Sequence, residues 1–273
     1  MQDLTQEWFA GRLPRRARET NKNDYGRVLA VCGWVGYTGA AYFAAQAAVR
    51  TGSGIVTLCV PHQIYPILAI KLNEPVIHPY DPAAPDLEAR AERADALLIG
   101  CGLGQSHEAK HLTYSLIRAA RCPIVIDADG INALAGHINV LQEAGGPVIL
   151  TPHAGEFTRL TGRAPTPENA AAVAAETGAI ILLKGYHSTI HTPTGESYRI
   201  LAGNPGMAKG GSGDVLAGCM LSLLGQRLFP PVETACIAAY LHARAGDLCA
   251  EALGEYGMTP TDLLNALPQA LLP

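Results

Sequence analysis

Short apolar runs alternate with alanine-rich segments along the chain as far as Lys184. The apolar runs are continuous and rich in β-branched residues, a pattern typical of strands that are covered on both faces. The predicted strands are residues 28–32, 55–60, 96–99, 124–126, 148–150 and 180–183. The predicted helices between them include residues 40–50, 112–120 and 168–177. This β-α alternation predicts an α/β fold in which helices cover a mainly parallel sheet.

The pattern changes after Lys184. Residues 188–191 and 198–201 flank the turn-like Pro193-Thr194-Gly195 and predict a hairpin, which leads into a glycine-rich stretch at residues 202–213. Apolar residues then recur at helical spacing, so the rest of the chain is predicted to be helical. The expected helices are residues 214–224, 232–252 and 260–270.

Composition narrows the class of protein. The chain has 273 residues, of which 48% are hydrophobic, and can bury one large core. The proline-rich residues 75–85 are the best candidate for a domain boundary, but they are short enough to be a surface loop. We therefore expect residues 1–273 to form a single domain.

Charge and cysteine content exclude several partners and compartments. The net charge of −4 and the lack of a sustained Lys/Arg block argue against nucleic acid and anionic membranes as partners. Seven cysteines without a C-x-x-C pair argue against a disulfide framework or a zinc site. The start of the chain lacks the pattern of a signal peptide, and no stretch approaches about 20 uninterrupted apolar residues. We expect a soluble cytoplasmic protein.

The glycine-rich stretch is the strongest indication of chemistry. Residues 203–218 have the sequence GNPGMAKGGSGDVLAG, and a helix is expected to begin near Ser212. Glycines before a helix leave its first backbone N–H groups open to phosphate oxygens, which the helix dipole also attracts. Asp214 would lie in the first turn, beside a bound phosphate. An aspartate there can also serve helix stability alone, but a purely structural connection seldom needs this many glycines.

Four further segments follow predicted strands, where open α/β sheets bind ligands. They are residues 33–41, 100–104, 127–132 and 151–156. The glycines of the first two permit close approach of a ligand or, equally, tight helix packing. Asp127 and Asp129 could face a cleft or cap a helix. Glu156 could be no more than a negative charge that interacts favourably with a helix dipole. His153 could donate to a polar or anionic substrate group or be a structural histidine.

Lys184 ends the predicted strand 180–183 and can reach a phosphate as a compact charge. Residues 186–189 could border a base or ribose. His187 and His191 lie in predicted strand and loop, so their rings would not share a helical face, and we expect no metal site there.

Three common motifs are missing. Residues 100–104 lack the third glycine of the dinucleotide fingerprint, which disfavours a Rossmann dehydrogenase. Lys209 precedes the glycine pair, so the turn is not a Walker A phosphate loop. Ser212 lacks the G-x-S-x-G order of a hydrolase elbow.

The chain resembles the ADP/ATP-dependent NAD(P)H-hydrate dehydratase family of the ribokinase superfamily, in its stand-alone bacterial form, over nearly its whole length. The blocks that carry the resemblance are DYGRVLAVCG, GYTGAAYFAAQAAVRTGSGIVTL, ALLIGCGLG, IVIDADGINAL, LTPHAGEFTRL, LLKG, GNPGMAKGGSGDVLAG and AGDLCAEALGEYGMTPTDLLNALP. Three residues depart from the family pattern: Trp34 replaces a common Ser, Ala154 a usual Pro, and Lys209 a usual Thr or Ser. The resemblance implies a ribokinase-like three-layer sandwich with a central, mainly parallel sheet, and a homo-oligomer that is a tetramer.

The resemblance also implies an activity, the repair of damaged cofactor. The S-epimer of NADHX or NADPHX would be dehydrated to NADH or NADPH, with ADP, or ATP in its place, as co-substrate and with Mg²⁺ accompanying the nucleotide. ADP would yield AMP and phosphate. Transfer of the β-phosphoryl group to the C6 hydroxyl would make it a phosphate ester, which the lone pair of the ring nitrogen can expel.

The same resemblance implies roles for individual residues. Asp214 would accept the hydroxyl proton, and the N–H groups of Gly211, Ser212 and Gly213 would stabilise the transferring phosphoryl group. The nucleotide would be held by Lys184, Gly185, Ser188, Asn204, Gly206, Gly210 and Gly213. The hydrate would be held by Ala40, Gly102, Gly104, His153 and Asp214. None of these residues is expected to be a metal ligand.

Two other functions stay open at this point. A small-molecule kinase of the same superfamily would keep the glycine turn, prefer ATP and release a stable phosphorylated product. A nucleotide-binding regulator would bind ADP without turnover.

Overall fold

The structure, a computed structural model, describes residues 1–83 and 85–272. Within these residues ten strands form one sheet in the order β1-β10-β9-β8-β7-β6-β5-β2-β3-β4. The strands are β1 (Gln2–Leu4), β2 (Arg27–Val31), β3 (Ile55–Pro61), β4 (Val76–Tyr80), β5 (Ala96–Ile99), β6 (Ile124–Ile126), β7 (Val148–Leu150), β8 (Ile180–Leu183), β9 (Thr189–His191) and β10 (Ser197–Ile200). The strands from β4 to β8 pair in parallel, whereas β9 is antiparallel to both of its neighbours.

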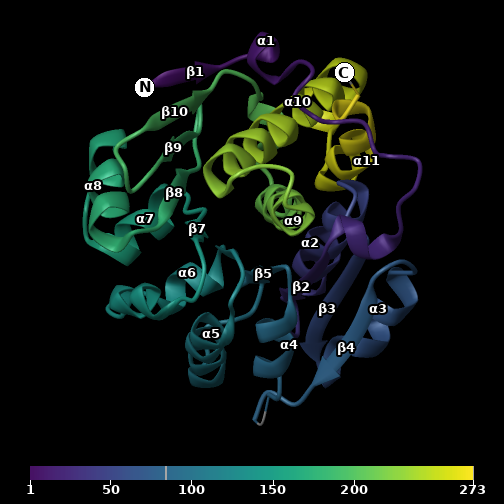
Figure 1. Ribbon diagram of the computed structural model, residues 1–273, viewed down its shortest axis with the longest axis vertical. Coiled ribbons are helices and arrows are strands. Elements are labelled where there is room, and N and C mark those ends of the chain that lie inside the picture. Colours follow the sequence, from purple (N-terminus) through teal and green to yellow (C-terminus); the bar gives the residue numbers. More distant parts are fainter. Residues whose placement is uncertain (84, 273) are drawn as a thin grey trace.

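Helices cover both faces of this sheet (Figure 1). The longer helices of one layer are α2 (Thr38–Arg50), α9 (Ser212–Gln226), α10 (Pro231–Gly257) and α11 (Pro260–Ala270). The opposite layer contains α4 (Glu88–Arg93), α5 (His107–Ala119), α7 (Ala154–Thr161) and α8 (Pro167–Thr177). The remaining helices are α1 (Gln6–Phe9), α3 (Tyr65–Lys71) and α6 (Asp129–Ala133), with short 3-10 turns η1 (Lys22–Tyr25), η2 (His62–Ile64), η3 (Ile138–Glu143) and η4 (Pro205–Met207).

Alternate residues of each central strand enter two separate cores. In β2, Val28 and Ala30 pack under the α2 and α9 layer, while Leu29 and Val31 pack under the α5 layer. Because both faces are buried, a strand of this kind is apolar throughout, which explains the continuous runs in the sequence. The three-layer architecture predicted for the chain is confirmed.

Helix α9 lies in the middle of its layer and is buried on nearly all sides. At Gly218 a Cβ atom would lie 2.1 Å from the carbonyl oxygen of Ala44, so only glycine allows α2 to approach this closely. The alanines of α2 and this glycine therefore fix the direction of α9, whose N-terminus points toward the carboxyl ends of the strands.

Most predicted elements are confirmed, including the β9–β10 hairpin and a helix that begins at Ser212. The interpretation of residues 75–85 as a boundary or loop was wrong for its first part, because Val76–Tyr80 is edge strand β4. The edge position tolerates Pro79, since no further strand needs its missing N–H. Ala84, in the same stretch, lies outside the described residues.

None of the helices in the described part of the chain combines the length and the apolar character needed to cross a membrane.

Candidate functional site

A cavity of about 760 Å³ opens at the carboxyl ends of the central strands. One wall comes from residues that follow β6, β7 and β8, namely Asp127, His153 and Lys184. The facing wall is the glycine-rich turn and the first turn of α9, residues 210–214. Helix α10 closes the base with residues that include His242. The fold thus brings the strand ends and the glycine turn to one space.

The glycine turn leaves the start of α9 open toward this cavity. Gly211, the N-cap residue, has φ of 105°, and no side chain caps the helix within the described residues. A Cβ atom on Gly211 would lie 2.9 Å from the ring of Phe43 and 3.1 Å from Pro260, so both backbone conformation and space require glycine. The N–H of Ser212 donates to the carbonyl oxygen of Lys209 at 3.2 Å, whereas those of Gly211 and Gly213 have no partner among the described residues. These two N–H groups and the positive end of the helix dipole make the turn a suitable anion site.

Lys184 faces the helix start across a space without side chains. A Cβ atom on Gly213 would lie 3.3 Å from Lys184 Nζ and 3.7 Å from Asp127 Oδ2. The absence of a side chain at Gly213 therefore keeps open the route between the ammonium group and the helix N-terminus. A phosphate group placed there would meet positive potential from both sides.

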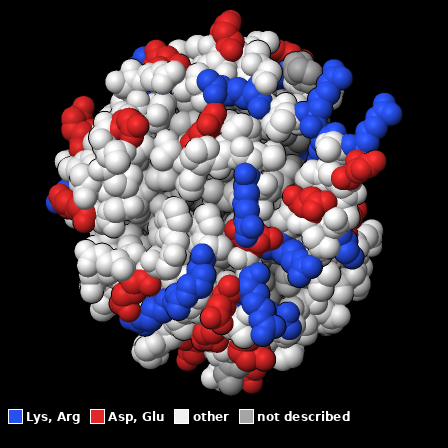
Figure 2. All heavy atoms as spheres, viewed as in Figure 1, with Lys and Arg blue, Asp and Glu red and all other residues white. Residues whose placement is uncertain are grey.

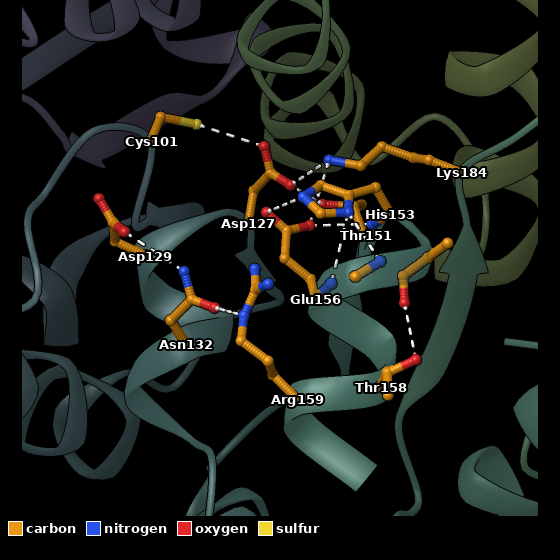
Figure 3. A network of polar contacts seen from close by, with 12 residues as sticks. Cys101, Asp127, Asp129, Asn132, Thr151, His153, Glu156, Thr158, Arg159 and Lys184 are labelled. Atoms are coloured by element: carbon orange, nitrogen blue, oxygen red, sulfur yellow. Dashed lines mark hydrogen bonds and ion pairs between the residues drawn. The ribbon is translucent and has the colours of Figure 1, made fainter. Parts of the chain in front are cut away.

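A buried polar network holds Lys184 in place (Figure 3). Its Nζ atom donates to Asp127 Oδ1 at 2.7 Å and lies 3.8 Å from Glu156 Oε2. Thr151 Oγ1 donates to the same Asp127 oxygen at 2.7 Å. Burial alone would lower the pKa of Lys184, but the charges of Asp127 and Glu156 outweigh it, and the pKa is raised. Lys184 therefore remains a cation.

Asp214 lies in the first turn of α9 and lines the cavity. Burial, followed by the negative charge of Asp127, raises the pKa of its carboxyl group from 3.8 to about 7. A carboxylate with a pKa near neutrality is a stronger base than an ordinary aspartate and is still ionised in part at pH 7. The geometry is that of a general base beside an anion site.

A divalent ion also fits this position. Single ligand atoms of Cys101, Asp127 and Asp214 lie within 4.8 Å of one another. The interaction with Cys32, followed by burial, raises the pKa of the Cys101 thiol, which makes it a poor ligand at neutral pH. Two carboxylates suit a Mg²⁺ ion that takes its other ligands from water and phosphate oxygens. The residues thus fit Mg²⁺ that arrives with a nucleotide.

Most residues predicted to hold a nucleotide or to act on it line the cavity. They are Lys184, Gly185, Ser188, Asn204, Gly210, Gly211, Ser212, Gly213 and Asp214. Gly206 does not; it is buried beneath the turn, where a Cβ atom would lie 2.5 Å from Met258 Sδ. Its direct role in nucleotide binding stays a prediction, and its evident role is packing.

Three residues predicted to hold the hydrate form a separate cluster outside the cavity lining. A Cβ atom on Gly102 would lie 2.8 Å from the Cβ atoms of both Ala40 and Tyr37. The N–H of Gly104 donates to Asp129 Oδ2 at 2.9 Å, and Trp34 packs 3.7 Å from the place of its missing Cβ. The glycines here serve close packing and a backbone hydrogen bond. A contact with the hydrate stays a prediction for Ala40, Gly102 and Gly104.

His153 lines the cavity but also caps α7. Its Nδ1 atom accepts from the N–H groups of Gly155 at 3.0 Å and Glu156 at 3.3 Å. In return, Glu156 Oε2 accepts from the N–H of His153 at 2.9 Å. Nδ1 is therefore committed to the fold, and only the Nε2–H group, 3.3 Å from Glu156 Oε1, is left for a substrate.

Lys209 has a structural role that the sequence did not indicate. Its Nζ atom donates to the carbonyl oxygens of Tyr256, at 2.8 Å, and of Met258. Asp247 holds the other end of the turn, because its carboxylate accepts from Gly203 N at 2.9 Å and Asn204 Nδ2 at 3.0 Å. The glycine-rich turn is thus held at both of its ends: Asp247 of α10 binds its start, and Lys209 binds the end of α10 and the residue that follows it.

Sequence reasoning did not single out His242 or Asp247 as site residues, although Asp247 lies in the block AGDLCAEALG that carries the family resemblance. Both belong to the alanine-rich helix α10, and they meet the turn only through the tertiary fold. The available signal was a set of polar residues within a helix whose other positions are mostly apolar.

Comparison with known proteins places the chain in a family. A family model described as NAD(P)H-hydrate dehydratase matches residues 28–269. The bifunctional NAD(P)H-hydrate repair enzyme of Moorella thermoacetica is 43% identical over 98% of this chain, which spans 53% of that protein. The ADP-dependent (S)-NAD(P)H-hydrate dehydratase of Listeria monocytogenes is 33% identical over 99% of this chain and 96% of its own length. The chain therefore spans about half of some curated relatives and nearly all of another.

Solved structures agree with this assignment. The ADP/ATP-dependent NAD(P)H-hydrate dehydratase of Bacillus subtilis, co-crystallised with ATP and Mg²⁺, superposes with a TM-score of 0.86 at 30% identity and covers 97% of this chain. Aminoimidazole riboside kinase of Salmonella enterica, at 13% identity and a TM-score of 0.57, shares the ribokinase-like fold alone. The match to the family model over residues 28–269 and the relatives together show that the chain belongs to the NAD(P)H-hydrate dehydratase family.

Proposed function

We propose that this protein dehydrates the S-epimer of NADHX and NADPHX to NADH and NADPH, with ADP as the phosphoryl donor. The observation that carries the proposal is the uncapped N-terminus of α9, which faces Lys184 across the cavity and bears Asp214 in its first turn. An anion site beside a base of raised pKa is what phosphoryl transfer to a hydroxyl group requires. Family membership supports the choice of substrate.

The steps follow from the positions of these groups. Asp214 takes the proton of the C6 hydroxyl as its oxygen attacks the β-phosphorus of ADP, and the bond from that phosphorus to the bridging oxygen breaks to release AMP. The N–H groups of Gly211 and Gly213 stabilise the charge that spreads over the transferring group, whereas that of Ser212, predicted to do the same, already donates to Lys209. The ring nitrogen then donates its lone pair, the C6–O bond breaks, and phosphate leaves. Loss of a proton from C5 gives the reduced nicotinamide.

ADP would occupy the side of the cavity lined by the turn and by residues after β8. Lys184 meets the phosphates, and Gly185, Ser188 and Asn204 lie where the rest of the nucleotide would extend. When bound, Mg²⁺ would neutralise phosphate charge, and Asp127 is the neighbouring carboxylate that would hold it while Asp214 stays free to act as the base. We propose ADP as the preferred donor, and ATP as a possible substitute, by similarity to the Listeria and Bacillus relatives.

We further propose that residues 1–273 act as one catalytic domain, in a cytoplasmic homotetramer. One hydrophobic core contains residues from Leu4 near the start of the chain to Ala270 near its end, which supports one domain. Exposed isoleucines at one edge support self-association: Ile67 and Ile70 of α3 are 46% and 83% exposed, beside Val76 of β4 at 59%.

All seven cysteines are free and buried, which suits a reducing compartment. Acidic and basic side chains are interspersed over the face seen in Figure 2.

One assay tests the activity. Purified protein is mixed with the hydrate and ADP, and absorbance of the reduced nicotinamide is followed together with AMP and phosphate. The expected result is formation of one AMP and one phosphate per reduced nicotinamide, with no turnover of the R-epimer. A stable phosphorylated product would indicate a kinase instead. Binding of ADP without any turnover would indicate a regulator.

A further inference from the structure

His242 lies in the middle of α10 and reaches the cavity from the side opposite the strands. It is buried, with 9% of its surface exposed. Its Nε2 atom lies 2.9 Å from the carbonyl oxygen of Ser212, the first residue of α9. This contact joins two helices at the point where the anion site begins.

The hydrogen bond fixes the form of the imidazole ring. A carbonyl oxygen only accepts, so Nε2 carries the proton and donates. Burial lowers the pKa of His242 from 6.5 to about 4; the hydrogen bond to Ser212 opposes this effect only in part, and the charge of Lys184 adds to the lowering. At neutral pH the ring is therefore neutral, with hydrogen on Nε2 and a lone pair on Nδ1.

The bonded carbonyl belongs to the peptide group that also contains the N–H of Gly213. This peptide is trans, like every other peptide bond in the described residues, so its C=O and N–H point in opposite directions. Gly213 lines the cavity beside Lys184. A restraint on the Ser212 oxygen is thus a restraint on the direction of the Gly213 N–H. A bond to the oxygen also polarises the peptide and makes its N–H a stronger donor.

We propose that His242 is a positioning residue for phosphoryl transfer: by donating to the Ser212 carbonyl, it aims the Gly213 N–H at the transferring group. The inference rests on the proposed function, because it assigns His242 a part in that reaction. This role acts through the Ser212 peptide group and requires no contact between His242 and the reacting atoms. Its effect is expected on the transition state more than on bound ADP, because charge on the transferring oxygens is what the N–H stabilises.

Two variants of matched size separate this role from packing. Gln and Met have similar length and volume, but only Gln keeps an N–H donor. We expect His242→Met to lower kcat about tenfold while KM for ADP changes less than about threefold, and His242→Gln to stay within about threefold of the parent kcat. Equal kcat values for the two variants would overturn the proposal, whatever their thermal unfolding midpoints.

A second measurement needs no variant. Nitrogen NMR of the histidine rings in the unmodified protein reports which ring nitrogen carries hydrogen. The proposal requires hydrogen on Nε2 of His242 at neutral pH, with and without ADP. Hydrogen on Nδ1 alone, with Nε2 unprotonated, would overturn it. Because this measurement involves no hydrate, it judges the His242 contact even if the turnover assay contradicts the proposed function.

Discussion

Two glycine-rich segments follow strands of the same sheet, yet they do different things. In residues 203–213 all the glycines except the buried Gly206 border a cavity, and a Cβ atom on Gly210 would meet nothing within 4 Å. In residues 100–104 the glycines are packed, since a Cβ atom on Gly100 would lie 2.1 Å from the carbonyl oxygen of Asp127. The N–H of Gly104 is already bonded to Asp129. Residues 203–213 thus contain backbone N–H groups that can bind a ligand, whereas the glycines of residues 100–104 allow close packing.

The difference shows that glycine content alone does not identify an anion site. What decides is whether the backbone N–H groups still lack partners after the segment has packed. In residues 203–213 the N–H groups of Gly210, Gly211 and Gly213 have no partner among the described residues, because a helix starts there with no side-chain cap. Hydrogen bonds to α10 hold the turn in place. The predictions that follow test this distinction.

The largest effect is expected at the carboxylate of the open turn. Asp214→Asn keeps the shape of the side chain but removes the base, so we expect kcat to fall by about two to four orders of magnitude. The affinity for ADP should be retained, because the anion site is made of backbone N–H groups and Lys184. Turnover and calorimetric ADP binding check this. An Asn variant that retains activity would exclude Asp214 as the base.

The pH dependence of activity should report the same group. Because the pKa of Asp214 is raised to about 7, the carboxyl group is increasingly protonated below that pH and cannot act as a base. We expect kcat/KM to fall about tenfold per pH unit below 7 and to level off above it. ADP binding over the same range separates this titration from that of the nucleotide. A rate that stays constant down to pH 5 would contradict the prediction.

An alanine substitution in each of the two glycine-rich segments adds one methyl group and allows a direct comparison. In Gly213→Ala the methyl group would enter the space beside Lys184, so we expect ADP affinity to fall about tenfold with no loss of stability, since Ala favours helix. In Gly102→Ala it would press on Ala40 and Tyr37, so we expect a loss of about 1–3 kcal/mol of unfolding free energy with ADP affinity unchanged. Calorimetry and denaturant unfolding measure both. If both variants lost stability and kept their affinity for ADP, the glycines of both segments would serve packing alone.

The sequence predicted the parts of this site that local pattern determines. Apolar runs located the strands, and the glycine run before an apolar helix located Asp214 and the anion site. Lys184 was found because it directly follows a strand. His242 was not found, because its function depends on a contact with Ser212, which is 30 positions away and on another helix. Likewise, the sequence around Gly102 resembles that around Gly213, and only their surroundings in the fold show that the first is packed and the second borders the cavity.

The smallest effect is expected at Lys209. Lys209 stands beside the glycine pair, where the family usually has Thr or Ser, so a contact with phosphate is the alternative to test. The structure has its ammonium group on the carbonyl oxygens of Tyr256 and Met258, after the non-helical Gly254 near the end of α10. We now expect Lys209→Thr to leave ADP affinity within about twofold at low salt, where a lost phosphate contact would be most visible. It should lower unfolding free energy by about 1 kcal/mol, the usual cost of such hydrogen bonds. A tenfold loss of ADP affinity with unchanged stability would instead assign Lys209 to the phosphates and extend the open anion site to the whole turn.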